Sequence, residues 1–168
     1  MVALLLGLIA RSATAEEIPL TLIITAEVVG QPCSLRPGDE TISVDFGGIL
    51  NKELLRDGRT PSKTFTLHLE QCDPAIADSV SVTFAGPAAD EDNNLLALAG
   101  NSTASGIAIG LEQGGQALPL NQASRPQVIE QEETTLDFGA YVQLLPSGQA
   151  GLTPGAFNAT ANFTLDYD

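Results

Sequence analysis

The C-terminal stretch, residues 155–168, alternates strictly between apolar and polar side chains. One face carries Phe157, Ala159, Ala161, Phe163, Leu165 and Tyr167, whereas the other face carries only Asn, Thr and Asp. A period of two predicts a strand with one buried face. Aromatic side chains continue to the penultimate residue, where most chains fray. We therefore expect the C-terminus to be held in a sheet, and some other element must cover its apolar face.

The N-terminus has the pattern of a secretory signal peptide over residues 1–15. A short apolar run, 3–10, is followed by Ala13-Thr14-Ala15, which fits an A-x-A cleavage site. The apolar run is too short to span a bilayer. The sequence therefore predicts an exported chain that begins at Glu16, with residues 16–168 forming a single domain of ordinary size and its N-terminal extension.

A second alternating stretch follows the predicted cleavage site. Its apolar face is formed by Ile18, Leu20, Leu22, Ile24 and Ala26. This stretch precedes the first cysteine, where a sandwich domain would begin. A free strand of this kind promotes aggregation, so it must find a partner. We assign residues 16–27 to an N-terminal extension and residues 28–168 to the domain.

The composition disfavours several classes of partner and chemistry. Cleavage would remove Arg11 and leave six basic residues (7 − 1) against 21 acidic ones, a net charge of −15. Nucleic-acid binding is disfavoured because it needs a basic patch. Binding to an anionic membrane surface is disfavoured for the same reason, and we expect no direct membrane insertion. His68 is the only histidine, and no nucleophile motif or phosphate-binding glycine loop is present. We predict no catalytic residue, no metal site and no cofactor, and we expect His68 to be exposed on the outer face of its strand.

Cys33 and Cys72 are the only cysteines. In an exported chain, the oxidising compartment favours a disulfide between them. Closing a loop of this length is worth roughly 4 kcal/mol by the chain-entropy estimate.

The interior of the chain has the pattern of short strands joined by turns rich in glycine and proline. We expect strands at 18–29, 41–46, 64–71, 79–85, 106–111, 117–120, 134–145 and 156–167, with a hairpin turn at 113–115 and a further turn at 148–155. The best helical candidate is the short stretch 51–56. Strands at this spacing, with a disulfide between early ones, predict an all-β fold of the immunoglobulin-like sandwich type.

The whole chain after the signal peptide resembles the pilin subunits of the chaperone–usher pathway, and is most similar in pattern to the minor tip adaptors of type 1 and P pili. Four features carry the resemblance: the segment 18–33, the cysteine pair, the stretches 94–98, 106–111 and 118–121, and the combination of Gly155 with the penultimate Tyr167. One position differs, because this family usually has a glycine on the inserting face of its N-terminal strand where this chain has Ala26.

The resemblance implies an incomplete immunoglobulin-like sandwich of six strands, whose seventh strand is supplied in trans. Ile18, Leu20, Leu22, Ile24 and Ala26 would form the donor strand for a neighbouring subunit. The acceptor groove and the chaperone contact would involve Gly155, Phe157, Ala159, Ala161, Phe163, Leu165, Tyr167 and Asp168. Implied partners are a periplasmic chaperone, an outer-membrane usher and neighbouring pilins in a head-to-tail fibre.

The resulting prediction is a structural, non-enzymatic fimbrial subunit for cell adhesion, exported through the periplasm to a fimbrium on the bacterial surface. The pattern favours an adaptor over a rod subunit. The alternative is a self-contained secreted module that binds a carbohydrate or a protein, in which case the N-terminal strand would fold into its own domain.

Overall fold

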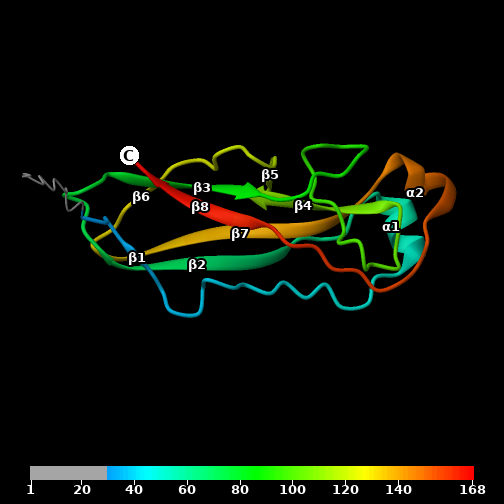
Figure 1. Ribbon diagram of the computed structural model, residues 1–168, viewed down its shortest axis with the longest axis horizontal. Coiled ribbons are helices and arrows are strands. Elements are labelled where there is room, and N and C mark those ends of the chain that lie inside the picture. The colour runs from blue at the N-terminus through cyan, green and yellow to red at the C-terminus, as the bar shows by residue number, and fades with distance from the viewer. Residues whose placement is uncertain (1–29) are drawn as a thin grey trace, which may run out of the picture.

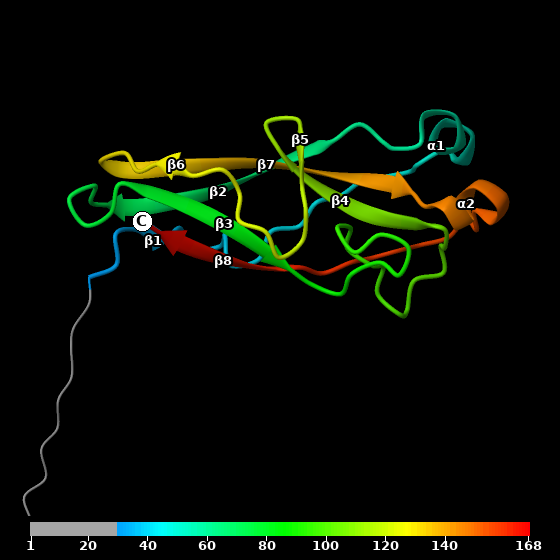
Figure 2. The same ribbon diagram turned by 90° about the horizontal axis from the view of Figure 1, so that it is seen from above.

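The computed structural model describes residues 30–168, which form two packed antiparallel sheets and two short helices (Figures 1 and 2). The five-stranded sheet has the order β1-β2-β7-β4-β5, and the three-stranded sheet has the order β6-β3-β8. The strands are β1 (Ser34–Leu35), β2 (Lys63–Cys72), β3 (Ser79–Ala85), β4 (Ile107–Gln113), β5 (Gln116–Leu118), β6 (Gln127–Val128), β7 (Glu132–Leu144) and β8 (Asn162–Tyr167). The predicted signal peptide and the predicted donor strand, 16–27, lie outside the described residues.

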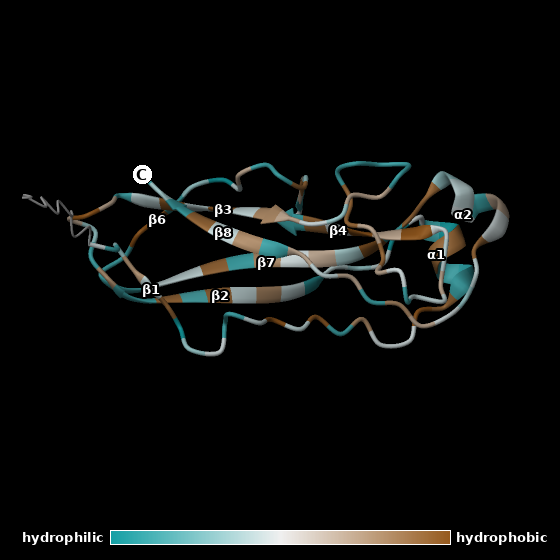
Figure 3. Ribbon diagram, viewed as in Figure 1, coloured by the Kyte–Doolittle hydropathy of each residue, from teal (hydrophilic) through white to brown (hydrophobic). Residues whose placement is uncertain are grey.

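The core lies between the two sheets and consists of alternate residues from their facing strands. Leu67 and Leu69 of β2, Val82 of β3 and Val142 of β7 have no exposed surface. β-branched and aromatic residues at a period of two are typical of such strands, because one face packs inside and the other meets solvent. Figure 3 shows hydrophobic residues recurring along the strands of both sheets. The predicted immunoglobulin-like sandwich is confirmed.

The β4–β5 hairpin turns at Gly114 and Gly115, with φ of 56° and 78°. Positive φ at both central positions suits a two-residue hairpin loop and favours glycine there. The hairpin predicted from the sequence is confirmed.

Both helices lie at one end of the sandwich, opposite the end where the described chain begins (Figures 1 and 2). Helix α1 (Asn51–Asp57) covers the predicted helical stretch and ends at Gly58, which has φ 76° and donates its N–H to the Leu54 carbonyl. A left-handed glycine after the last turn is a common helix stop. Helix α2 (Pro146–Gly151) was not predicted, since residues 148–155 were expected to form only a turn.

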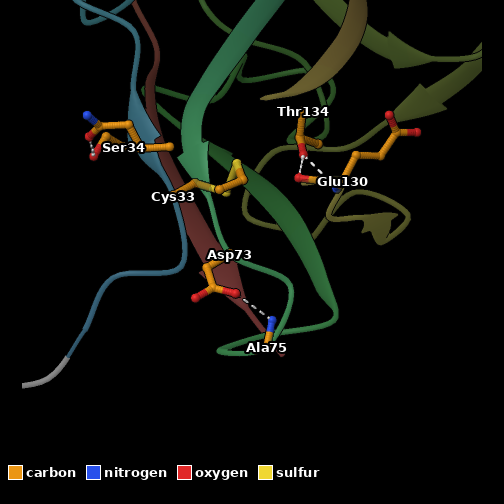
Figure 4. Close-up of a disulfide and its surroundings, with 8 residues drawn as sticks. Cys33, Ser34, Asp73, Ala75, Glu130 and Thr134 are labelled. Atoms are coloured by element: carbon orange, nitrogen blue, oxygen red, sulfur yellow. Dashed lines mark hydrogen bonds between the residues drawn. A yellow bond between two sulfur atoms is a disulfide. The ribbon is translucent and has the colours of Figure 1, made fainter. Parts of the chain in front are cut away.

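The disulfide between Cys33 and Cys72 is confirmed, with a Cα–Cα distance of 4.1 Å. It joins the start of the domain to the end of β2 (Figure 4). Next to it, Asp73 donates its N–H to the Pro32 carbonyl at 2.8 Å. The start of the described chain is therefore fixed at the end of the sandwich remote from the helices.

Two predicted strands differ from the observed ones. Residues 41–46 pair with no strand in the described part of the chain, so this predicted strand is wrong in its pairing, although its side chains do alternate between exposed and half-buried. The predicted strand 156–167 is a ladder only from Asn162 onward. Strand β3 pairs with residues 162–167, and 156–161 extend beyond its end. Both segments border the groove described next.

Candidate interaction groove

An open groove of about 970 Å³ runs along the sandwich between two extended segments, 40–47 and 155–163. Its floor contains side chains from both sheets, including Phe65 and Leu67 of β2, Phe84 of β3 and Ile109 of β4. Phe46 on one rim faces Phe157 on the other, with ring centroids 6.3 Å apart. The groove therefore opens directly into the hydrophobic core of the domain.

The floor is built around a cluster of three aromatic rings. Phe84 packs edge-on against Phe138 at 5.1 Å and against Phe65 at 6.0 Å between centroids. Phe163 of β8 adds a fourth ring, 6.4 Å from Phe84. Edge-to-face pairs of this kind hold the rings in fixed orientations. Phe65 and Phe84 lie in the strands predicted at 64–71 and 79–85, but the sequence pattern did not indicate that their rings meet.

The apolar face of β8 is only half-buried, unlike that of its neighbour. On β3, the residues Val80 and Val82 are 1% and 0% exposed. Their partners across the ladder, Tyr167 and Leu165, are partly buried. An inner strand of a sandwich buries its apolar face completely when both of its sides are covered. The lower burial of the β8 side chains shows that part of the hydrophobic core is uncovered beside β8.

The backbone of this segment has one satisfied edge and one open edge. Ser79 and Asp168 exchange two hydrogen bonds, each of 3.0 Å. Because bonded pairs alternate along an antiparallel ladder, the even-numbered residues 162–168 point their N–H and C=O groups toward β3. Farther back, the carbonyls of Asn158 and Ala156 accept hydrogen bonds from Ala99 and Thr103, both at 2.8 Å. The odd-numbered residues 157–167 therefore point their backbone groups toward the groove.

The opposite rim has an open edge as well. Among the described residues, no backbone–backbone hydrogen bond involves 41–49. Ile42, Val44 and Phe46 nevertheless pack their side chains against the core. Two extended segments thus present unpaired backbone groups to the same gap. A buried or half-buried edge of this kind is a template for another strand.

The rim 41–46 is anchored at its start by a contact that the sequence did not reveal. Asp39 accepts two hydrogen bonds from His68, one from the backbone N–H at 2.7 Å and one at Nδ1 at 2.8 Å. These bonds hold the pKa of Asp39 below its usual range, the backbone bond having the larger effect. His68 does lie on the outer face of β2, but it is half-buried under Asp39, so the prediction of an exposed side chain is wrong.

The predicted acceptor residues fall into two groups. Gly155, Phe157, Ala159, Ala161 and Phe163 line the groove. Leu165 and Tyr167 continue the same edge beyond it, whereas Asp168 turns its backbone groups toward β3. At the terminus, Asp168 accepts the N–H groups of Asp78 at 2.8 Å and Ser79 at 3.0 Å. Burial raises the pKa of the Tyr167 hydroxyl.

Among the groups that the described part of the chain brings together, none combines three or more metal-ligating side chains. Neither of its two helices has the length or the hydropathy to span a bilayer.

Comparison with known proteins identifies the class. Residues 22–168 match the family model described as "Fimbrial protein". The chain is 33% identical over 143 residues to the Fimbria A protein of Serratia marcescens, covering 85% of this chain and 81% of that protein. It is 34% identical over 155 residues to the Type-1 fimbrial protein, A chain, of Escherichia coli K12, covering 88% and 82%.

Solved structures agree with these sequence relatives. The P pilus rod subunit PapA has a TM-score of 0.71 at 25% identity, covering 82% of this chain and all of that chain. A subunit in a chaperone–usher pilus has a TM-score of 0.70 at 25% identity, covering 94% and 100%. The P pilus adaptor subunit PapF shares the fold, with a TM-score of 0.53.

The chain belongs to the fimbrial protein family. It is a structural, non-enzymatic pilin with an incomplete immunoglobulin-like fold, and it is exported through the periplasm to a surface fimbria.

Proposed function

We propose that this pilin polymerises by donor-strand exchange, in which the extension 16–27 of one subunit fills the groove of another. The observation that carries the proposal is the pair of unpaired backbone edges, at 41–49 and at the odd-numbered residues of 157–167, on either side of an apolar groove. A single inserted strand would satisfy both edges and cover the core. Adding a strand to an exposed sheet edge is a known mode of protein recognition, and complementation of pilins is one of its established examples.

The donor strand enters antiparallel to β8 in this proposal. All six strand pairs of the two sheets are antiparallel, and an antiparallel ladder is slightly more stable than a parallel one. Ala159 and Ala161 leave room on the groove wall between Phe157 and Phe163. A register that pairs Ala26 with Phe157 places a small donor side chain opposite a large one on this wall.

In the same register, large donor residues meet the two alanines: Ile24 lies opposite Ala159, and Leu22 lies opposite Ala161. Leu20 and Ile18 continue toward the C-terminal end of β8. All of these donor side chains then point into the core, because opposite residues on paired strands share a face. Burying each one is worth roughly 1.5–3 kcal/mol.

Substitution of the donor strand tests the proposal. Leu22→Asp should block the formation of oligomers while the subunit still folds with its chaperone, because a carboxylate cannot enter the apolar groove unpaired. Thr21→Asp is the matched control, since Thr21 lies on the polar face of the same stretch. Oligomers would be measured by size-exclusion chromatography after release from the chaperone. Equal assembly of the two variants would contradict donor insertion.

Deletion of residues 16–25 separates this function from a self-contained binding module. A pilin that donates its extension should still fold with its chaperone and accept a donor peptide. If the deletion instead unfolds the isolated domain, the extension belongs to its own sheet and the binding module is the better interpretation.

We also propose that a periplasmic chaperone holds the groove before assembly, that an usher assembles the subunits, and that the fimbria serves cell adhesion. The chaperone would contact Leu165, Tyr167 and the terminal carboxylate of Asp168 at the end of β8. Charged donors in the chaperone would make strong bonds to that carboxylate. Removing Tyr167 and Asp168 should therefore reduce co-purification with the cognate chaperone, and unchanged complex would exclude this role.

The position in the fibre has two candidates. The adaptor role favoured by the sequence pattern stays a prediction. A rod role is supported by relatives named as major subunits, such as the Major MR/P fimbria protein of Proteus mirabilis, 32% identical over 171 residues. Immunogold labelling decides between them, since an adaptor would be labelled near one end of a fibre and a rod subunit along its length.

A further inference from the structure

The described part of the chain has four large apolar side chains that are exposed, and they lie at opposite ends of the sandwich. Leu50 and Leu55, 53% and 44% exposed, lie at the start of helix α1 and within it, at the helical end. Ile76 and Val128, 51% and 68% exposed, lie at the end that carries the disulfide. Single exposed apolar residues are ordinary. Two of them, Leu50 and Ile76, lie where the proposed insertion would bring two subunits together.

We propose that consecutive subunits make a second contact outside the groove, in which Leu50 of the acceptor packs against Ile76 of the donor. The occupant of each surface is therefore a second copy of this chain. The proposal rests on the donor-strand exchange proposed above, because the geometry of insertion brings these two ends together.

On the donor side, Ile76 lies next to the point where the extension leaves the domain. Its Cδ1 atom is 3.5 Å from the position that a Cβ on Gly30 would occupy. The turn that carries Ile76 is held to the start of the domain, since Asp73 donates its N–H to the Pro32 carbonyl at 2.8 Å. Ile76 therefore moves as one body with the root of the extension.

The length of the extension limits how far the two domains can separate. In the proposed register Ala26 lies beside Phe157, and only four residue steps join Ala26 to Gly30. Four fully extended steps span at most about 14 Å. The donor domain, with Ile76 at its root, must therefore lie against the end of the groove formed by Phe157.

On the acceptor side, Leu50 lies at that same end. Phe46 faces Phe157 across the groove with ring centroids 6.3 Å apart, and Leu50 follows Phe46 by four residues toward α1. The backbone of Leu50 thus lies within about 14 Å of that of Phe46. Both exposed side chains fall within a short reach of one junction, where packing them together would remove apolar surface from water.

The antiparallel direction of insertion is essential to this juxtaposition. The donor runs opposite to β8, so its C-terminal root leaves the groove where residues 155–157 enter it, beside the helical end (Figures 1 and 2). Parallel insertion would place the donor domain at the C-terminal end of β8 instead. There it would lie beside the acidic terminus and far from Leu50.

A charge swap across the junction tests the contact in assembled fibres. Leu50→Glu and Ile76→Lys should each cause a loss of fibre persistence length, measured by electron microscopy, with the yield of fibres unchanged. The chain with both substitutions should regain stiffness, because each junction then contains an acceptor carboxylate opposite a donor ammonium. Val128→Lys is the control for Ile76→Lys, since it makes the same change at the other exposed residue of that end and should not restore stiffness to Leu50→Glu.

The outcomes distinguish this inference from the proposed function. Fibres of wild-type stiffness from both single variants, or equal rescue by Val128→Lys, would overturn the end contact while leaving donor exchange intact. Assembly that persists in the Leu22→Asp variant would overturn donor exchange itself. If Leu50→Glu reduces folding, Leu50→Ser removes the same apolar contact and should give the same loss of stiffness.

Discussion

Removal of the disulfide should lower the stability of the domain by about 4 kcal/mol. The bond joins Cys33 and Cys72 across a sequence separation of 39. For a loop of this length, the chain-entropy estimate gives about 13 cal/mol/K, or about 4 kcal/mol at 25 °C. Both cysteines are 4% exposed. Replacement of both by serine also places two hydroxyls in a nearly dry site, which adds to the loss.

The local structure around the bond should persist, so the loss should be global. Asp73 still donates its N–H to the Pro32 carbonyl at 2.8 Å, and Arg36 donates its N–H to the His68 carbonyl at 2.9 Å. These bonds hold the start of the domain against the end of β2 in the folded state. The main effect of the substitution is therefore on the unfolded chain, which gains freedom when the cross-link is absent.

Urea unfolding of the subunit complemented by a saturating peptide of residues 16–29 measures the effect. With an m value of about 2 kcal/mol/M, a loss of about 4 kcal/mol lowers the midpoint by about 2 M. The peptide concentration must be the same for each variant, because ligand binding raises apparent stability. Ser34→Ala, an exposed change next to Cys33, should leave the midpoint unchanged. A shift below about 0.5 kcal/mol in the double serine variant would refute the entropic account.

Two further predictions concern the rim and the outer face of the five-stranded sheet. Hydrogen bonds from His68 lower the pKa of Asp39 in the folded state. The ionised Asp39 therefore stabilises the fold fully above its ordinary pKa of 3.8, and this stabilisation is lost as pH falls through the lower pKa of the folded state. The hydrogen-exchange protection factor of the His68 amide, which donates to Asp39 at 2.7 Å, should therefore fall at acid pH, and Asp39→Ala should show that fall already at pH 7. Gly110→Ala places a Cβ against the Tyr141 ring, closer than van der Waals contact allows, and should cost about 1–3 kcal/mol in thermal unfolding. Gly48→Ala, which has open space, should be neutral.

Local sequence pattern predicted strands well where the pattern and the pairing coincide. The expected strand 79–85 is β3 without change, because turns at both ends limit it and both of its neighbours pair with it. The stretch 41–46 has equally good alternation, yet it has no partner among the described residues. Alternation reports which side chains are buried and does not report whether another strand lies alongside.

Contacts between distant segments account for most of what the sequence did not reveal. Helix α2 contains two of its own glycines, and glycine is a poor helix former. Gly148 is required there because a Cβ at this position would overlap the carbonyl oxygen of Gly106. The hydrogen bonds between Asp39 and His68 likewise join residues 29 positions apart. No periodic pattern encodes such pairs.

The half-buried face of β8 packs against the core of the domain and also lines the groove. Substitutions on this face therefore affect both folding and assembly. Phe163 packs against Phe84 inside the domain, and it also lines the groove that the donor would fill. A substitution at Phe163 would change folding and assembly together, so a loss of fibres would not separate the two. The donor residues lie outside the domain in the proposed mechanism, and Leu22 makes its contacts only in the assembled fibre. Substitutions in the donor therefore isolate assembly, whereas substitutions in the groove measure the coupling of assembly to folding.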